Sequence, residues 1–191
     1  MMKRIIIEEK HFEKIEFSQT ALIVGEYENC IFSNCNFSNT NLSGISFSEC
    51  TFNSCNLSLA KLTNTTFRDI KFKDCKLLGL HFDDCNKFLF TVYFENCILN
   101  LSSFYKLNIR KTKFKNSSLK EVDFTESNLT DSIFDNCELT TTIFENTILE
   151  KVNFRTSYNY SIDPEINRIK KAKFSTTGIV GLLHKYDIEI D

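Results

Sequence analysis

Eight cysteines offer the most chemistry in this 191-residue sequence, because a thiolate binds soft metals, attacks electrophiles and forms disulfides. They stand at Cys30, Cys35, Cys50, Cys55, Cys75, Cys85, Cys97 and Cys137. Up to residue 85 the gaps between them are multiples of five. That spacing matches neither the period of about 3.6 residues of a helix nor the period of about two residues of a strand. The fold that places the cysteines must be found before their chemistry can be judged.

Groups suited to catalysis are sparse. The three histidines, His11, His81 and His184, lie far apart in the sequence, and the five glycines form no phosphate-binding loop. No Ser/His/Asp, Cys/His or paired-carboxylate arrangement stands out. We therefore expect a protein that is not an enzyme, with no catalytic residue, no metal site and no cofactor.

Composition also limits the class of partner. Charged residues make up 25% of the chain and the net charge is −2, which is untypical of a polybasic nucleic-acid binder or an acidic disordered tail. The N-terminal MMKRIII carries three consecutive isoleucines, too few for a signal peptide or a membrane span. We expect a cytoplasmic protein that binds a protein partner, with no direct nucleic-acid binding and no contact with a membrane.

A five-residue repeat accounts for the cysteine spacing. From Thr20 the chain divides into units such as CIFSN (30–34) and CNFSN (35–39). The third slot is Leu or Phe in nearly every unit, with Tyr27 and Ile109 as the exceptions, and the first slot is mostly small or β-branched. The other three slots are largely polar. Two apolar slots in five predict a chain that turns a corner every five residues.

A second period, of twenty residues, gives the number of corners in one coil. Third-slot phenylalanines follow this period, with two extra residues in the segment 85–91, at Phe12, Phe32, Phe52, Phe72, Phe94, Phe114, Phe134, Phe154 and Phe174. Four corners per coil predict an all-β solenoid, a quadrilateral β-helix of about seven coils over residues 1–175, with coils about 4.8 Å apart. We expect a right-handed solenoid, although the pattern itself does not fix the hand.

This register decides how the inward side chains are interpreted. Every cysteine falls in a first slot, so we expect buried, unpaired thiols that act as compact hydrophobic groups. Metal binding and redox sensing are the alternatives. The stacked phenylalanines are expected to form a filled core rather than a ligand slot or an electron path.

An acidic band is the first candidate contact surface. Residues 121–150 contain no base and the acids Glu121, Asp123, Glu126, Asp131, Asp135, Glu138, Glu145 and Glu150. Equivalent positions on successive coils alternate in charge, as in Asp84, Lys106 and Glu126, which favours pairing across adjacent strands. The band is therefore either a solvated and partly neutralised face or a docking surface for a basic groove of a protein partner.

The two-residue bulge at 85–91, CNKFLFT, is the second candidate contact. Only one large side chain can take the inward place there, and we expect that residue to be Leu89. Phe88 or Phe90 would then project outward as a contact point for a partner.

The C-terminal end is the third candidate. The repeat breaks in a loop at 157–171, and residues 176–191 are expected to form a helical cap over the last coil. The apolar residues of that cap at helical spacing are Ile179, Leu182, Leu183 and Tyr186. The cap either covers the coil alone or also pairs with a second subunit.

The units CNFSN, CNLSL, SNLTD and VDFTE match the A(D/N)LXX motif, so the sequence resembles the pentapeptide-repeat family from about residue 10 to residue 156. Within that family, the chain length, the cysteine-rich units and the helical ending resemble the Qnr-type quinolone-resistance proteins. The resemblance implies a homodimer joined through its C-terminal ends. It also implies binding to, and protection of, a type II topoisomerase such as DNA gyrase by imitation of DNA, with the acidic band near the dimer centre.

Two features depart from the Qnr-type pattern. The chain has a two-residue bulge where Qnr-type proteins of Gram-negative bacteria have two long loops, and its net charge of −2 is a poor copy of DNA. The alternative function is a structural rod that binds some other protein and has no topoisomerase activity.

Overall fold

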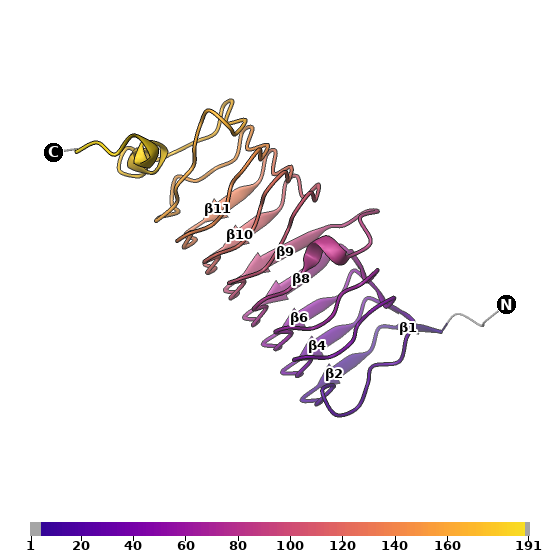
Figure 1. The fold of residues 1–191 in the computed structure, drawn as a ribbon. Coiled ribbons are helices and arrows are strands. Elements are labelled where there is room, and N and C mark those ends of the chain that lie inside the picture. Colours follow the sequence, from indigo (N-terminus) through magenta and orange to yellow (C-terminus); the bar gives the residue numbers. More distant parts are fainter. Residues whose placement is uncertain (1–4, 190–191) are drawn as a thin grey trace.

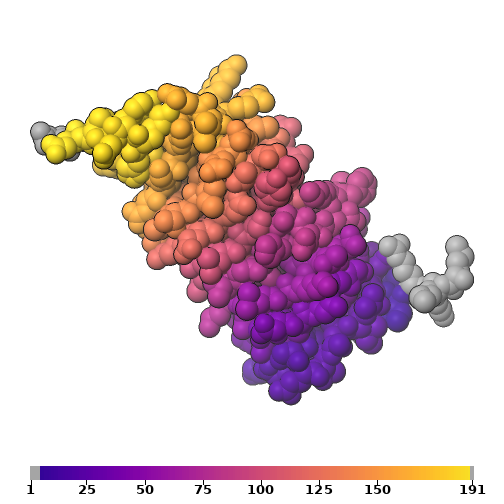
Figure 2. Space-filling model, viewed as in Figure 1, coloured from indigo at the N-terminus to yellow at the C-terminus, as the bar shows by residue number. Residues whose placement is uncertain are grey.

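The computed structural model describes residues 5–189, which form an elongated rod of stacked coils (Figure 1). The space-filling view shows the sequence colours following one another from end to end, so that each stretch of sequence occupies its own slab of the rod (Figure 2). No helix in residues 5–189 is long and apolar enough to cross a membrane.

Two parallel sheets cover two sides of the rod. The smaller sheet runs in the order β1 (Ile6–Glu8), β3 (Glu26–Glu28), β5 (Ser46–Ser48) and β7 (Thr66–Arg68). The larger sheet runs in the order β2 (His11–Glu13), β4 (Ile31–Ser33), β6 (Thr51–Asn53), β8 (Ile70–Lys73), β9 (Val92–Glu95), β10 (Lys113–Lys115) and β11 (Ile133–Asp135). The seven strands of the larger sheet agree with the expected coil number.

The rod has four faces, as the twenty-residue period predicts. Face 1 carries the smaller sheet and continues through the bridges Asn108–Asn128, Asn128–Ile148 and Ile148–Arg168. Face 2 carries the larger sheet and continues through Ile133–Asn153 and Asn153–Lys173. Face 3 is a line of bridges from Glu16–Asn36 to Glu138–Tyr158, and face 4 includes His81–Ser103, Ser103–Asp123 and Asp123–Ile143.

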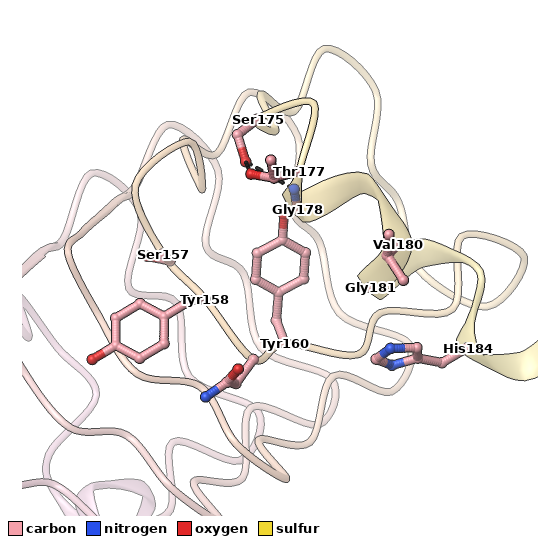
Figure 3. A pocket seen from close by; sticks show the side chains of 10 residues that line it. Ser157, Tyr158, Tyr160, Ser175, Thr177, Gly178, Val180, Gly181 and His184 are labelled. Atoms are coloured by element: carbon pink, nitrogen blue, oxygen red, sulfur yellow. Dashed lines mark hydrogen bonds between the residues drawn. The ribbon is translucent and has the colours of Figure 1, made fainter. Parts of the chain in front are cut away.

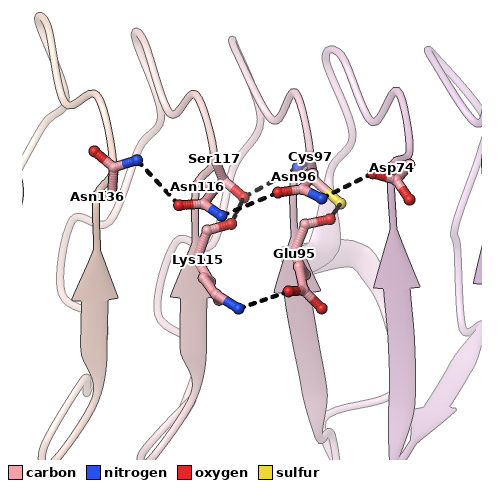
Figure 4. A network of polar contacts seen from close by, with 8 residues as sticks. All are labelled: Asp74, Glu95, Asn96, Cys97, Lys115, Asn116, Ser117 and Asn136. Atoms are coloured by element: carbon pink, nitrogen blue, oxygen red, sulfur yellow. Dashed lines mark hydrogen bonds and ion pairs between the residues drawn. The ribbon is translucent and has the colours of Figure 1, made fainter.

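In most units the fifth slot turns the corner between two faces. Residues there adopt the left-handed conformation, for example Asn96 at φ 54° and Asn116 at φ 49°, which Asn, Asp and Gly tolerate best. At the corner between faces 2 and 3 their side chains also join the coils (Figure 4). Asn136 Nδ2 donates to Asn116 Oδ1 at 3.0 Å, Asn116 Nδ2 donates to Asn96 Oδ1 at 3.2 Å, and Asn96 Nδ2 donates to Asp74 Oδ1 at 2.9 Å.

Phenylalanine rings stack along the interior of the rod. The ring centroids of Phe32 and Phe52 lie 4.8 Å apart with planes 9° from parallel, and those of Phe52 and Phe72 lie 5.1 Å apart. The column begins at Phe12 and reaches Phe174, whose centroid lies 5.5 Å from that of Phe154. The predicted stacking is confirmed. Each ring buried in such a column stabilises the fold by about 1.5–3 kcal/mol before its entropy cost is subtracted.

The bulge lies where a second aromatic column changes face. Toward the N-terminal end of the rod the column runs on face 1 and ends at Phe67. Toward the C-terminal end it runs on face 4 and begins at Phe82, within the 3-10 helix η1 (Phe82–Asp84). Phe90 fills the junction, with its ring 6.4 Å from that of Phe67 and 6.2 Å from that of Phe82.

The expectation for the bulge is wrong in part. Phe90 is buried, so it points inward and is not a contact point, and Leu89 is 53% exposed. The reason is local backbone geometry: Leu89 has φ 56° and takes a corner, which turns the next residue inward. Phe88, 74% exposed, is the residue that projects.

The coils resume before the C-terminal segment. Arg168 forms a bridge with Ile148, which places a regular rung inside the expected loop at 157–171. The expected helical ending consists of two short 3-10 helices, η2 (Gly178–Leu182) and η3 (His184–Tyr186). Gly181 lets η2 approach the last coil, because a Cβ atom there would clash with the carbonyl oxygen of Tyr160.

Candidate functional site

The cysteines are core residues. All eight are buried and unpaired. Cys55 Sγ, for example, donates to the carbonyl oxygens of Phe32 and Asn53, both at 3.3 Å. Burial raises the pKa of Cys50 and of Cys137 to about 12, which keeps both thiols protonated and unreactive at neutral pH. Within residues 5–189 no three His, Cys, Asp or Glu side chains gather in a way that could hold a metal ion.

Half of the acidic band is neutralised by neighbouring coils. Glu126 pairs with Lys106 at 3.3 Å, Asp131 with Lys151 at 4.0 Å, Glu138 with Lys120 at 2.9 Å and Glu150 with Arg168 at 2.6 Å. The basic side chains of these pairs are 43–67% exposed and the acidic ones 23–44%, so solvent screens each pair and it contributes about 0–1 kcal/mol to stability. Their main effect is to remove net charge from those parts of the band.

The other four acids form no ion pair with a described residue, and three of them lie together. Glu121 is at the corner between faces 3 and 4, Asp123 points outward from face 4, and Glu145 points outward from the next coil of face 4. These three residues are named the acidic corner. Asp135 lies apart on face 2, where its carboxylate accepts a hydrogen bond from Thr156 Oγ1 at 3.0 Å.

Phe88 stands beside a shallow hollow on face 1. The hollow measures about 210 Å³. It is lined by Glu26, Glu28, Ser46, Ser48, Thr66, Arg68, Phe88 and Leu89. An exposed ring next to a partly charged hollow is suited to a contact with a protein side chain.

The C-terminal end leaves apolar side chains uncovered. Ile179 and Tyr186 are each 50% exposed, whereas Leu182 packs against the core and Leu183 is partly buried. Lys185 holds the segment to the coil below through Asp163, at 2.8 Å. A hollow of about 350 Å³ remains between the last coil and η2.

Figure 3 shows this C-terminal hollow, with Tyr160 beneath η2 and His184 at the rim. The Tyr160 hydroxyl is buried against Gly178 and has no hydrogen-bond partner in the described chain. Because it is covered by the backbone of η2, this hydroxyl is closed to a ligand in the hollow.

A family model described as "Pentapeptide repeat region" matches residues 26–87 and 87–159. The chain belongs to the pentapeptide-repeat family. No curated protein sequence matches the chain in a direct comparison.

Three similar solved structures are of QnrB1, described as a plasmid-mediated fluoroquinolone resistance protein. One trypsin-treated form is 18% identical with a TM-score of 0.61, covering 98% of each chain. A second trypsin-treated form is 17% identical with a TM-score of 0.62, covering 99% of this chain and 100% of QnrB1. The full-length form is 17% identical with a TM-score of 0.55, covering 96% and 100%. At this identity the likeness shows a shared pentapeptide-repeat fold.

Two of the ion pairs could have been found in the sequence. The pairs Lys120–Glu138 and Glu150–Arg168 join residues eighteen positions apart, so they run diagonally between neighbouring coils rather than along one column. Diagonal neighbours on a sheet lie within reach of long side chains. A search limited to positions twenty residues apart misses them and makes the acidic band look uniform.

The buried thiols predict a loss of stability at high pH. The pKa of Cys50 and Cys137 in the folded protein is about 12, above the usual value of 9.0. Their contribution to the free energy of unfolding is therefore fully present below about pH 9 and is lost as pH rises toward 12. We expect each thiol to cost about 1.4 kcal/mol of unfolding free energy at pH 10 relative to pH 8.

Urea unfolding followed by circular dichroism at pH 8, 9 and 10 measures this effect. The Cys50→Ala/Cys137→Ala variant is the control, because it lacks both titrating groups. It should start less stable at pH 8 and lose less stability than the original chain by pH 10. Parallel pH profiles for the two proteins would contradict the assignment.

Proposed function

We propose that this chain is a non-catalytic, protein-binding rod whose acidic corner docks on a type II topoisomerase in place of DNA. The observation that carries the proposal is the grouping of Glu121, Asp123 and Glu145 on neighbouring coils, with no ion pair to a described residue. The Qnr-type features of the sequence, and the fold shared with the fluoroquinolone resistance protein QnrB1, support the choice of a topoisomerase as partner.

The acidic corner offers a cluster of negative charge, as DNA does. Glu121 and Asp123 belong to one coil and Glu145 to the next, about 4.8 Å along the rod, and one DNA strand carries about one charge per 3.4 Å of axis. The laddered backbone holds the carboxylates in place: Phe124 N donates to Ile143 O at 3.0 Å, and Glu126 N to Glu145 O at 2.8 Å. Because the charges are already positioned, docking on a basic groove costs little ordering entropy.

A second candidate function is a rod for a different protein, bound through Phe88. The ring is 74% exposed beside the hollow on face 1, which is on another side of the rod from Asp123 and Glu145. An exposed aromatic ring of this kind anchors protein contacts by filling an apolar pocket in the partner.

The proposed rod is a homodimer joined through its C-terminal ends. The half-exposed Ile179 and Tyr186 support this arrangement, together with Val180, which is 38% exposed. A second copy would cover the apolar end of the solenoid, a surface that repeat proteins must protect from water.

The topoisomerase proposal predicts rescue of DNA gyrase from a fluoroquinolone. In a supercoiling assay, purified protein should restore activity, and the Glu121→Gln/Asp123→Asn/Glu145→Gln variant should need at least about tenfold more protein, since the attraction to a basic groove is lost. Direct binding of immobilised gyrase, measured at increasing salt, should weaken in parallel.

The matched control removes the same charge elsewhere. The Glu28→Gln/Glu49→Gln/Asp69→Asn variant alters acids of the N-terminal coils and should rescue as well as the original chain. If the protein neither rescues nor binds gyrase at any concentration, the topoisomerase proposal is rejected. In that case, a partner recovered by the original chain and lost with Phe88→Ala would support the second candidate.

The dimer proposal predicts that charge in the cap separates the subunits. Light scattering at micromolar concentration should give twice the chain mass for the original protein and the chain mass for Ile179→Asp/Tyr186→Ser, because a buried unpaired charge is costly. The control Ile31→Asp/Tyr93→Ser changes exposed or partly exposed residues of face 2 and should stay dimeric. A monomer before any substitution would contradict the proposal.

A further inference from the structure

We propose that the edge between faces 1 and 2, over the C-terminal coils, binds the phosphate backbones of double-stranded nucleic acid. This surface is named the basic edge. Its cationic residues are Arg110, Lys111, Lys113, Lys151, Arg168, Lys170, Lys171 and Lys173. The inference goes beyond the proposed function, because it assigns a second surface and a different class of partner.

Six of these residues form two equivalent triplets. The upper triplet is Lys170, Lys171 and Lys173, and the lower triplet is Arg110, Lys111 and Lys113. Lys171 takes the corner at φ 61°, and Lys111 takes the same corner three coils earlier at φ 60°. Lys173 and Lys113 point outward from face 2, in the column linked by the Lys113–Ile133, Ile133–Asn153 and Asn153–Lys173 pairings. Arg110 and Lys170 hold matching positions on face 1. Each triplet therefore surrounds the same corner of the rod.

The two triplets carry available charge. Two carboxylates lie on this edge, and both are already paired within the rod: Asp131 with Lys151 at 4.0 Å and Glu150 with Arg168 at 2.6 Å. None of the six triplet residues forms an ion pair with a residue in the described part of the chain. The basic edge thus keeps a local charge of about +6, although the whole chain has a net charge of −2.

The separation of the triplets fits a duplex. Three coil steps of about 4.8 Å separate Lys111 from Lys171, which gives about 14 Å. The major groove of B-form DNA is about 12 Å wide, so one triplet can meet each phosphate strand across the groove. Between them lies a hollow of about 380 Å³ at Ile133 and Asn153, which leaves room for phosphate oxygens.

Nucleic acid fits this edge better than the other anionic partners. A free phosphate ion needs donors that converge on one point, whereas these cations are spread along a line. Six of the eight edge cations are lysines, which act as point charges and suit contacts that do not read sequence. The basic edge also lies diagonally opposite the acidic corner, so the two surfaces can be occupied independently.

Fluorescence anisotropy with a labelled 20-base-pair DNA duplex tests the inference. Between 50 and 200 mM KCl we expect a dissociation constant of about 10⁻⁶–10⁻⁴ M that weakens steeply with salt. The Lys170→Gln/Lys171→Gln/Lys173→Gln variant should reduce the slope of log K against log salt by about 2.7, or about 0.9 per lost phosphate contact.

The control variant is Lys61→Gln/Lys76→Gln/Lys87→Gln, which removes three exposed lysines outside the basic edge and should change the slope by less than about 1. Circular dichroism of all variants verifies the fold. Absence of binding at 50 mM KCl, or an equal loss in the control, would overturn the inference. Equal affinity for a single strand of the same length would overturn the assignment to a duplex, and tighter binding of poly-glutamate would assign the edge to an acidic protein instead.

Discussion

Vertical register between coils is the constraint on which the other features of this protein depend. The rings of Phe114 and Phe134 stack 4.7 Å apart only because Lys113 pairs with Ile133 and Lys115 with Asp135 on either side of them. Ring stacking and the backbone ladder therefore specify the same alignment. A slip of one residue would turn the inward rings to solvent and place charged side chains in the core.

The same register determines what the surface can do. An outward side chain lies above its counterpart on the coil below, so charges of opposite sign neutralise each other, as Glu95 and Lys115 do at 2.8 Å. Net charge is concentrated where the alternation fails, as at Glu121 and along Lys170 and Lys171. Because the interior is filled by side chains, recognition belongs to the outside of the rod. The acidic corner and the basic edge are two places, on opposite corners of the rod, where the sign of the charge does not alternate from coil to coil.

Much of the fold could be predicted from residue spacing, because Phe32, Phe52 and Phe72 repeat at the length of one coil. The inward side chain of the bulge could not be predicted, because Leu89 and Phe90 are both large and apolar. The left-handed backbone at Leu89 decides that Phe90 turns inward. The surfaces were only half predictable. The acidic run was visible in the sequence, but a comparison of positions twenty residues apart does not reveal its diagonal ion pairs, and a net charge taken over the whole chain conceals the basic edge.

Deletion of one whole coil tests the register most directly. Removing residues 107–126 joins Lys106 to Ser127 and leaves every later residue in its column, whereas removing residues 107–124 shifts the later columns by two positions. The account predicts cooperative urea unfolding and a β-rich circular dichroism spectrum for the first deletion, with a lower midpoint than the complete chain. It predicts loss of the C-terminal coils for the second. Equal behaviour of the two deletions, folded or unfolded, would contradict it.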